Sequence, residues 1–212
     1  NWGLSPLSLI FMDPPFSSNQ LEFLERCAEA RRVSFSFKDP LIVHHFDADG
    51  LSSGAIVQSA FRKEKKKYRA LAVKKLDDAL IEKLKSEQEI IFVDLGGGNK
   101  RVNELKDVVI IDHHQTEGVE KLQANPMLFG IDGGMELSAA GAAAFVFGIH
   151  YDLGVVGAVG DMEYPLVGMN RHLLQKGIDS GEVEAKIDLR MYGRHSRPLI
   201  DFLAYSDEPF IP

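Results

Sequence analysis

Histidine and aspartate side chains crowd into residues 41–50, which read LIVHHFDADG. An apolar run leads into His45, Asp47 and Asp49, and side chains two residues apart lie on the same side of an extended strand. One imidazole and two carboxylates pointing the same way favour a metal site over a solvated turn. The stretch therefore predicts a cation site at the end of a buried strand.

Two later apolar runs also end in candidate metal ligands. Residues 89–94 read EIIFVD and end in Asp94, and residues 107–112 read DVVIID and lead directly into His113. Ligands of open parallel sheets gather at the carboxyl ends of the strands, so we expect these side chains to meet. With the acid of GAVGDM, the predicted ligands are His45, Asp47, Asp49, Asp94, His113 and Asp161.

Two imidazoles and four carboxylates suit a pair of divalent cations, with Mn²⁺ the first expectation and Mg²⁺ the second. The carboxylates carry about −4 and two such ions about +4, so a filled site is nearly neutral and accepts a phosphate. A metal pair about 3.5–4 Å apart supports in-line displacement at phosphorus. We expect Asp94, on the central strand, to bridge the two ions.

The elements that must position these residues alternate between strand and helix. This rhythm predicts an α/β fold, with a predominantly parallel sheet flanked by helices. Strands are expected at 41–46, 68–75, 89–94 and 107–112, and helices at 20–32, 51–65, 77–85 and 99–105. Residues 33–37 are expected to form a short edge strand or a connector. Further along we expect a strand at 127–131, helices at 136–149, 165–176 and 197–205, a packed small-residue segment at 153–160 and an extended stretch at 184–190.

Composition sets broad limits on the function. The 212 residues carry a formal net charge of −7, which argues against indiscriminate polyanion binding but leaves nucleic acid open if cations fill the acidic site. The single cysteine, Cys27, favours a reducing, cytoplasmic location and a buried structural thiol. Residues 139–160 contain His150 and Asp152, so we expect buried helices there and no membrane span.

Four short motifs together resemble those of the DHH phosphoesterase superfamily. They are HFDADG at 45–50, the acid of VDLGGG at 94, DHH at 112–114 and GDM at 160–162. The resemblance is closest to RecJ-type nucleases and their archaeal relatives. It implies one metal on His45, Asp47 and Asp94, and another on Asp49, Asp94, His113 and Asp161. It also implies that His114 contacts the scissile phosphate and that Asp112 orients its neighbours.

The resemblance also implies a domain plan. Residues 1–39 would form an N-terminal helix and lead-in, 40–205 the DHH catalytic domain, and 206–212 the start of a linker. Related nucleases continue into a second lobe, DHHA1, that carries a Gly-Gly-Gly-His motif. The three glycines at 96–98 are followed by Asn99 and belong to the Asp94 motif. We therefore expect a catalytic-domain fragment without that lobe.

Substrate contacts are expected from five further residues, Ser52, Ser53, Gly97, Arg194 and Arg197. A helix start and a glycine turn can offer backbone N–H groups to a phosphate, and arginines can grip a phosphate backbone. By contrast, Phe145, Phe147 and Met162 are expected in the core, and the histidines at 44, 150, 172 and 195 in structural roles.

The function predicted from these residues and the resemblance is a metal-dependent phosphodiesterase, namely an exonuclease on single-stranded DNA or RNA. The first alternative is hydrolysis of small phosphodiesters, such as short oligonucleotides or cyclic dinucleotides. The second is a replication-complex scaffold with residual activity. Replication or repair proteins are expected as further partners, and no membrane. A pyrophosphatase ranks low because that branch spaces its first His and Asp more widely than His45 and Asp47.

Overall fold

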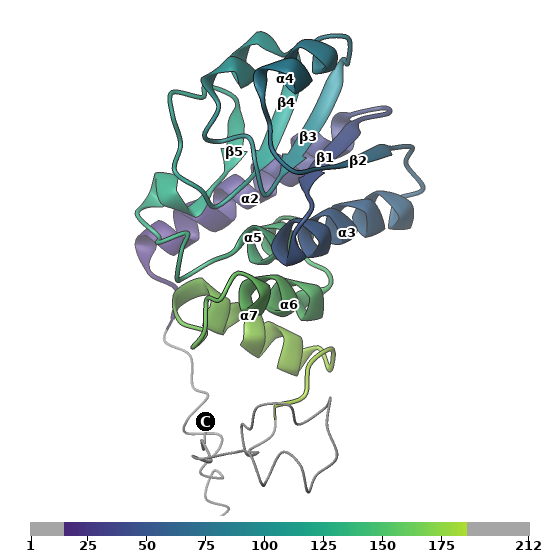
Figure 1. The fold of residues 1–212 in the computed structure, drawn as a ribbon. Helices are drawn as coiled ribbons and strands as arrows, with labels where there is room; N and C mark the ends of the chain where they lie inside the picture. Colours follow the sequence, from purple (N-terminus) through teal and green to yellow (C-terminus); the bar gives the residue numbers. More distant parts are fainter. Residues whose placement is uncertain (1–14, 186–212) are drawn as a thin grey trace, which may run out of the picture.

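A five-stranded sheet lies at the centre of the computed structural model, which describes residues 15–185 (Figure 1). All strand pairs are parallel, in the order β2-β1-β3-β4-β5. The strands are β1 (Leu41–His45), β2 (Arg69–Val73), β3 (Glu89–Val93), β4 (Asp107–Ile111) and β5 (Leu122–Ala124). This architecture confirms the predicted α/β fold with a parallel sheet.

The strand order reverses at β1. The chain passes from β1 outward to β2 and then crosses to β3, on the other side of β1. In an open α/β sheet, the connections after two such strands leave in opposite directions and open a crevice at their carboxyl ends. The predicted ligands that follow β1 and β3 lie at this point.

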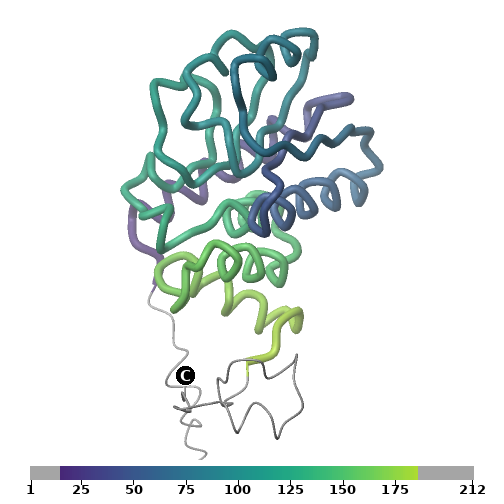
Figure 2. The backbone as a smooth tube through the Cα atoms, viewed as in Figure 1, coloured from purple at the N-terminus to yellow at the C-terminus, as the bar shows by residue number. Residues whose placement is uncertain are grey.

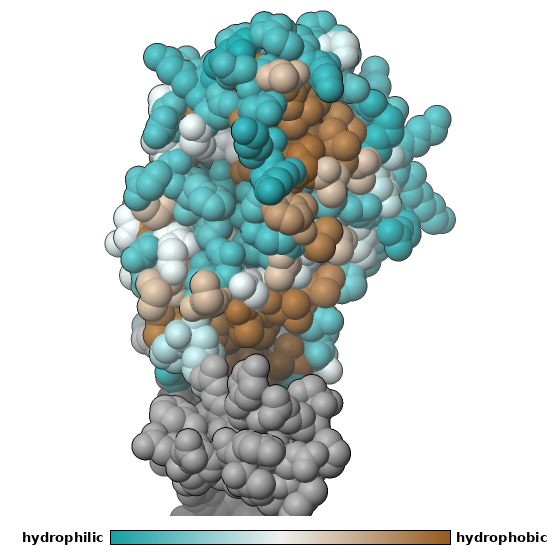
Figure 3. All heavy atoms as spheres, in the orientation of Figure 1, coloured by the Kyte–Doolittle hydropathy of each residue, from teal (hydrophilic) through white to brown (hydrophobic). Residues whose placement is uncertain are grey.

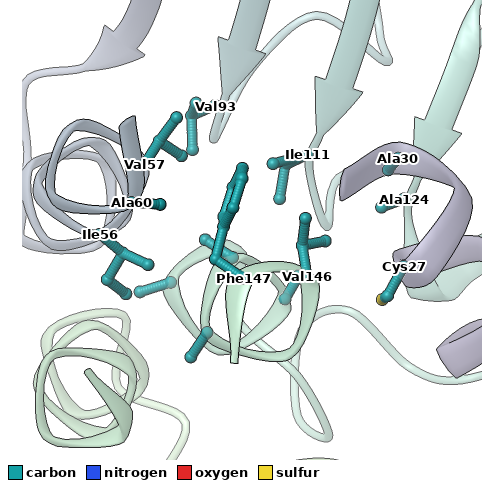
Figure 4. Packing of buried hydrophobic residues seen from close by; sticks show 14 of the residues in the cluster. Cys27, Ala30, Ile56, Val57, Ala60, Val93, Ile111, Ala124, Val146 and Phe147 are labelled. Atoms are coloured by element: carbon teal, nitrogen blue, oxygen red, sulfur yellow. The ribbon is translucent and has the colours of Figure 1, made fainter. Parts of the chain in front are cut away.

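Helices cover both faces of the sheet. The helices of the described residues are α2 (Ser18–Ser36), α3 (Ala48–Lys63), α4 (Asp78–Leu84), α5 (Ala139–Phe147), α6 (Tyr151–Gly160) and α7 (Gly168–Asp179), with two short 3-10 helices, η1 (Lys100–Glu104) and η2 (Pro126–Phe129). The strands β1, β3 and β4 are buried on both sides, so their alternate residues enter separate cores, whereas the edge strand β2 is mostly exposed. Ile91 packs in the core with α2, α3 and α5, whereas Phe92 packs in the core with α4 and η1. Figure 4 shows the first core, where Phe147 of α5 lies between Val57 of α3 and Val146.

Helices α6 and α7 form a further layer that packs on α3 and α5 and does not touch the sheet in the views of Figures 1 and 2. Gly157 permits the close approach of α6, because a Cβ there would collide with the Asp49 carboxylate and with Ala140. The outer side of α6 leaves Val156 and Val159 half exposed. Hydrophobic residues accordingly show on the molecular surface over this layer (Figure 3).

Three local predictions are wrong. Residues 33–36 continue helix α2, because Phe35 packs on Phe61 and Phe147 and the helix ends only at Ser36. The strand expected at 127–131 is the 3-10 helix η2, which Pro126 starts, and the edge strand is β5 just before it. Met162 is 86% exposed and outside the core.

Buried helices were expected within residues 139–160. Both segments are helical, but only α5 is almost wholly buried, because α6 buries just Gly154, Gly157 and Ala158. Among the described helices, none combines the length and apolar character needed to cross a bilayer. Cys27 is buried in α2, where burial raises the pKa of its thiol, in line with a structural role. The helix expected at 197–205 and most of the stretch expected at 184–190 lie outside the described residues.

Candidate metal centre

The segment after β1 is a helix start and not an extended strand, which corrects the predicted geometry. Asp47 is the N-cap of α3, and its Oδ1 accepts the N–H of Gly50 at 2.9 Å. Its Oδ2 lies 2.7 Å from Nδ1 of His45, the last residue of β1. A Cβ at position 50 would collide with the backbone of His45, so glycine is required for this sharp turn.

Asp49 lies in the first turn of α3 and faces away from Asp47. Two residues along an α-helix rotate a side chain by about 200°. Both oxygens of Asp49 accept N–H groups at the start of α5, from Ala139 at 2.8 Å and Ala140 at 3.0 Å. The two aspartates therefore serve different sides of the site although they are close in sequence.

Asp94 lies between these two sides. It follows β3 with φ of +60°, a left-handed conformation that aspartate tolerates better than most residues and that turns its carboxylate out of the strand direction. Its Oδ2 is 3.4 Å from His45 Nδ1, and its Oδ1 is 3.3 Å from His113 Nε2. One buried carboxylate thus faces both neighbouring groups.

His113, directly after the strand end of β4, faces two further acids. Its Nε2 is 3.4 Å from Asp161 Oδ2 and 3.8 Å from Asp49 Oδ2. We call Asp49, His113 and Asp161 the inner cluster, and His45 with Asp47 the outer cluster. Potential ligand atoms lie within 4.8 Å of one another in the inner cluster, and also in the outer cluster together with Asp94.

Two buried atoms fit a cation at this position. Within the part of the chain that the structure describes, Asp94 Oδ2 and His113 Nε2 have no hydrogen-bond partner. An unpaired buried polar atom is costly, and both atoms point into the group of carboxylates. All six predicted ligands therefore converge in one place, with the donor types that Mn²⁺ and Mg²⁺ accept.

The electrostatics of the protein alone also favour a cation here. Burial lowers the pKa of His113, but the nearby carboxylates of Asp94 and Glu163 and the charge of Asp49 outweigh it and raise the pKa to about 12. Burial and the charge of Asp94 raise the pKa of Asp49 to about 7, against the opposing charge of His113. Bound protons thus supply the positive charge that a metal ion would bring.

Asp112 and His114 form a pair at the edge of the site. Asp112 is fully buried and accepts the N–H groups of Gly97 at 2.9 Å and His113 at 2.8 Å. It also lies 2.8 Å from Nδ1 of His114, which raises the pKa of that imidazole. Asp112 is therefore placed to orient its neighbours, and the half-exposed His114 is placed to meet a ligand.

A hollow of about 340 Å³ opens beside the outer cluster. His45, Asp94 and His114 line it on one side, and Lys74 and Lys75, which follow β2, line it on another. The 3.1 Å contact between His45 Nε2 and the Lys74 carbonyl joins the two sides. The hollow therefore combines the metal centre with cationic side chains that suit an anionic ligand.

The structure describes three of the five residues that were expected to contact the substrate. Ser53 is fully buried and its hydroxyl donates to the Gly50 carbonyl, so it exposes no atom to a ligand. Ser52 is also buried. The N–H of Gly97 is used by Asp112 and is not free for a phosphate. Arg194 and Arg197 lie outside the described residues.

Glu163 and the two lysines were missed by sequence reasoning. Glu163 is 1% exposed and faces Nδ1 of His113, whereas Asp49 and Asp161 face Nε2 on the opposite edge of the ring. Its proximity to the GDM motif was the available signal. Lys74 and Lys75 were placed in a strand, although a basic pair at the end of a strand next to β1 indicates a position near the crevice.

The model of the DHH family, N-terminal domain, matches residues 40–157, which is more than half of the chain. The uncharacterized protein MJ0831 of Methanocaldococcus jannaschii is 31% identical over 219 residues, covering 89% of this chain and 50% of the relative. This chain thus spans about half the length of the curated relative that it matches.

Solved structures share the fold. Exonuclease RecJ bound to manganese superposes with a TM-score of 0.60 at 22% identity, over 74% of this chain and 47% of that one. CDC45 from Entamoeba histolytica does so with a TM-score of 0.53 at 17% identity, over 84% and 41%. With the motifs, the fold and the matched residues in agreement, the chain belongs to the DHH family.

Proposed function

We propose that this protein is a metal-dependent phosphodiesterase that removes nucleotides from the end of single-stranded nucleic acid. The observation that carries the proposal is the position of Asp94, a buried carboxylate that faces the inner cluster with one oxygen and the outer cluster with the other. Such sharing suits two divalent ions held side by side.

Each cluster would hold one ion, with Asp94 common to both. The ions would supply Lewis acidity for the attack of water on a phosphodiester and for stabilising the charge on its oxygens. The inner cluster contributes one ligand in the first turn of α3, one shortly after β4 and one at the C-cap of α6. In the outer cluster, His45 lines the hollow. We expect Mn²⁺ to be bound in preference to Mg²⁺ because two histidines belong to the set.

His114 would contact the substrate phosphate. Asp112 fixes its Nδ1 and raises its pKa, so the ring holds a proton that it can donate to a phosphate oxygen. Lys74 and Lys75 would face the negative charge of the same or a neighbouring phosphate from across the hollow.

Hydrolysis of short oligonucleotides or cyclic dinucleotides is the second candidate. A hollow of about 340 Å³ is at the small end of the range for ligand pockets and suits one or two nucleotides. The same catalytic groups would act on a short substrate and on the end of a long one, so substrate length separates the two candidates.

The test is a comparison of labelled single-stranded DNA, single-stranded RNA, dinucleotides and pyrophosphate as substrates, each with and without Mn²⁺. We expect Mn²⁺-dependent release of mononucleotides from the single strands. Cleavage confined to dinucleotides would favour the second candidate. Lack of turnover of every substrate, in this chain and in a longer chain of the same length as its relatives, would contradict an enzymatic function.

A further inference from the structure

Glu163 is a buried acid outside the ligand set, and it lies against the metal centre. It follows Asp161 at the end of α6, is 1% exposed, and its Oε1 is 3.4 Å from Nδ1 of His113. Within the described part of the chain, Oε1 has no hydrogen-bond partner. A buried carboxylate oxygen is costly unless a positive group or a donor faces it, and the donor nearest to this one is His113.

The imidazole of His113 is held from both edges. Nδ1 lies 2.5 Å from the carbonyl oxygen of Gly133, so this nitrogen carries the proton and donates it. Nε2, on the opposite edge, faces Asp49, Asp94 and Asp161, and its lone pair would serve an ion that displaces the Nε2 proton. Glu163 adds a negative charge on the Nδ1 side, which strengthens the electron donation from Nε2.

A rigid support holds Glu163 in place. The Nδ2 group of Asn170, in α7, donates to Oε2 of Glu163, and the Glu163 N–H donates to the Ala158 carbonyl at 3.0 Å. Asn170 is itself fully buried, and its backbone N–H donates to the Glu136 carbonyl at 2.7 Å. Asn170 of α7 is thus connected through Glu163 to His113, and neither Asn170 nor Glu163 lines the hollow where a substrate would lie.

We propose that Glu163 is a positioning residue for the metal centre, which orients His113 and strengthens its binding of the inner ion. The inference rests on the proposed metal site and adds a residue that the DHH motifs do not include. Groups that support a histidine ligand from its far nitrogen commonly change metal affinity by about 10–100-fold when they are removed.

The test uses Glu163→Gln and Glu163→Leu. Glutamine removes the charge but keeps the shape, and Asn170 can turn its amide to accept from it, because Asn170 Oδ1 has no partner in the described part of the chain. Leucine removes the polar contact as well. Glu182→Gln is the matched control, since Glu182 accepts the Tyr151 N–H at the other end of α6, about 15 Å away along the helix.

Binding of Mn²⁺ is measured from the EPR signal of the free ion, with thermal unfolding of the metal-free proteins recorded in parallel. We expect the tighter Kd to weaken about tenfold in Glu163→Gln and up to about a hundredfold in Glu163→Leu, with the weaker Kd and the control unchanged. If leucine prevents folding, the isosteric glutamine variant decides alone.

Unchanged Kd values in Glu163→Gln, or an equal loss in Glu182→Gln, would overturn the positioning role while leaving the metal site intact. Absence of Mn²⁺ binding by the unmodified protein would instead overturn the proposed function, and the role of Glu163 with it. The two failures are therefore distinguishable.

Discussion

Two of the three side chains in the inner cluster, those of Asp49 and His113, are 0% and 5% exposed, and that of Asp161 is 33% exposed, whereas those of His45 and Asp47 in the outer cluster are 25% and 40% exposed. Asp49 is held by two backbone N–H groups of α5, and His113 by the Gly133 carbonyl and the nearby Glu163. The outer ligands lie at a strand end and a helix cap beside an open hollow. One aspartate and one histidine of the inner cluster are therefore buried and prearranged, whereas the aspartate and histidine of the outer cluster are accessible to solvent.

This difference indicates a division of labour. A buried, prearranged site loses little entropy on binding an ion, whereas an exposed one must order its ligands and compete with water. We infer that the inner ion binds more tightly and that the outer ion lies closer to the substrate. Substitutions in the two clusters and changes of pH test whether they differ in this way.

Asp94→Asn should have the largest effect because it removes the carboxylate that both clusters share. We expect a loss of several kcal/mol of transition-state stabilisation, on the order of a thousandfold or more in kcat/KM. Bound Mn²⁺, measured by equilibrium dialysis, should fall below one ion per chain. An unchanged metal content would show that Asp94 is not the bridge.

Metal affinity should increase with pH. The pKa of Asp49 is about 7, so at pH 5 an ion must displace its proton and at pH 8 it need not. Between these values the inner Kd should tighten by about a hundredfold from Asp49 alone, and His113 adds to this. Isothermal titration with Mn²⁺ in two buffers of different ionisation enthalpy would count the released protons. A Kd independent of pH would contradict the assignment of the inner ligands.

The same pKa values predict how the folding stability of the protein without metal changes with pH. The folded state binds protons more tightly than the unfolded state at both groups, with Asp49 raised from 3.8 to about 7 and His113 from 6.5 to about 12. Their stabilising contributions are complete below the unfolded values and are lost as pH rises through the folded values. Thermal unfolding should therefore show Tm falling from pH 5 to pH 9 without metal, and much less with Mn²⁺.

A matched pair of histidine substitutions separates the clusters. His113→Gln should weaken the tighter ion by about 10–100-fold, whereas His45→Gln should weaken only the weaker one. At a low concentration of free Mn²⁺, the first variant should bind no ion and the second should retain one. EPR titrations give both constants. The comparison fails if His45→Gln removes the tighter ion.

The sequence predicted which residues converge in the site, but it did not predict the backbone geometry that brings them together. The positions of Asp94 and His113 were predicted because acids and histidines follow apolar strands there. Strands, and their alternation with helices, can be recognised from local sequence. Asp47 and Asp49 were expected on the same side of an extended chain, but the tertiary contact of Asp49 with the start of α5 favours a helix start and separates them.

The remaining errors involve contacts between segments far apart in the chain. Glu163 reaches His113 across 50 residues, and no local pattern reports such a contact. The three-residue strand β5 has too few residues for a period to be seen. Met162 has the composition of a core residue, but its backbone adopts φ of +60° after the helix end and exposes it.

Ser138→Ala should have the smallest effect. Ser138 is the N-cap of α5, and its loss should cost about 1 kcal/mol of folding free energy. Because the same helix start holds Asp49, the tighter Kd should also weaken a few-fold. Asp77→Ala is the control, since it removes an N-cap from α4, which contributes no ligand. Chemical denaturation and Mn²⁺ titration measure both effects, and equal changes in Kd would mean that the α5 cap has no special connection to the inner cluster.

The central claim is that one carboxylate, Asp94, is shared by two ions. Anomalous diffraction at the manganese edge, from crystals grown with Mn²⁺, tests it most directly. We expect two peaks about 3.5–4 Å apart, with one oxygen of Asp94 on each or a single oxygen between them. A single peak, or two peaks of which only one contacts Asp94, would contradict it.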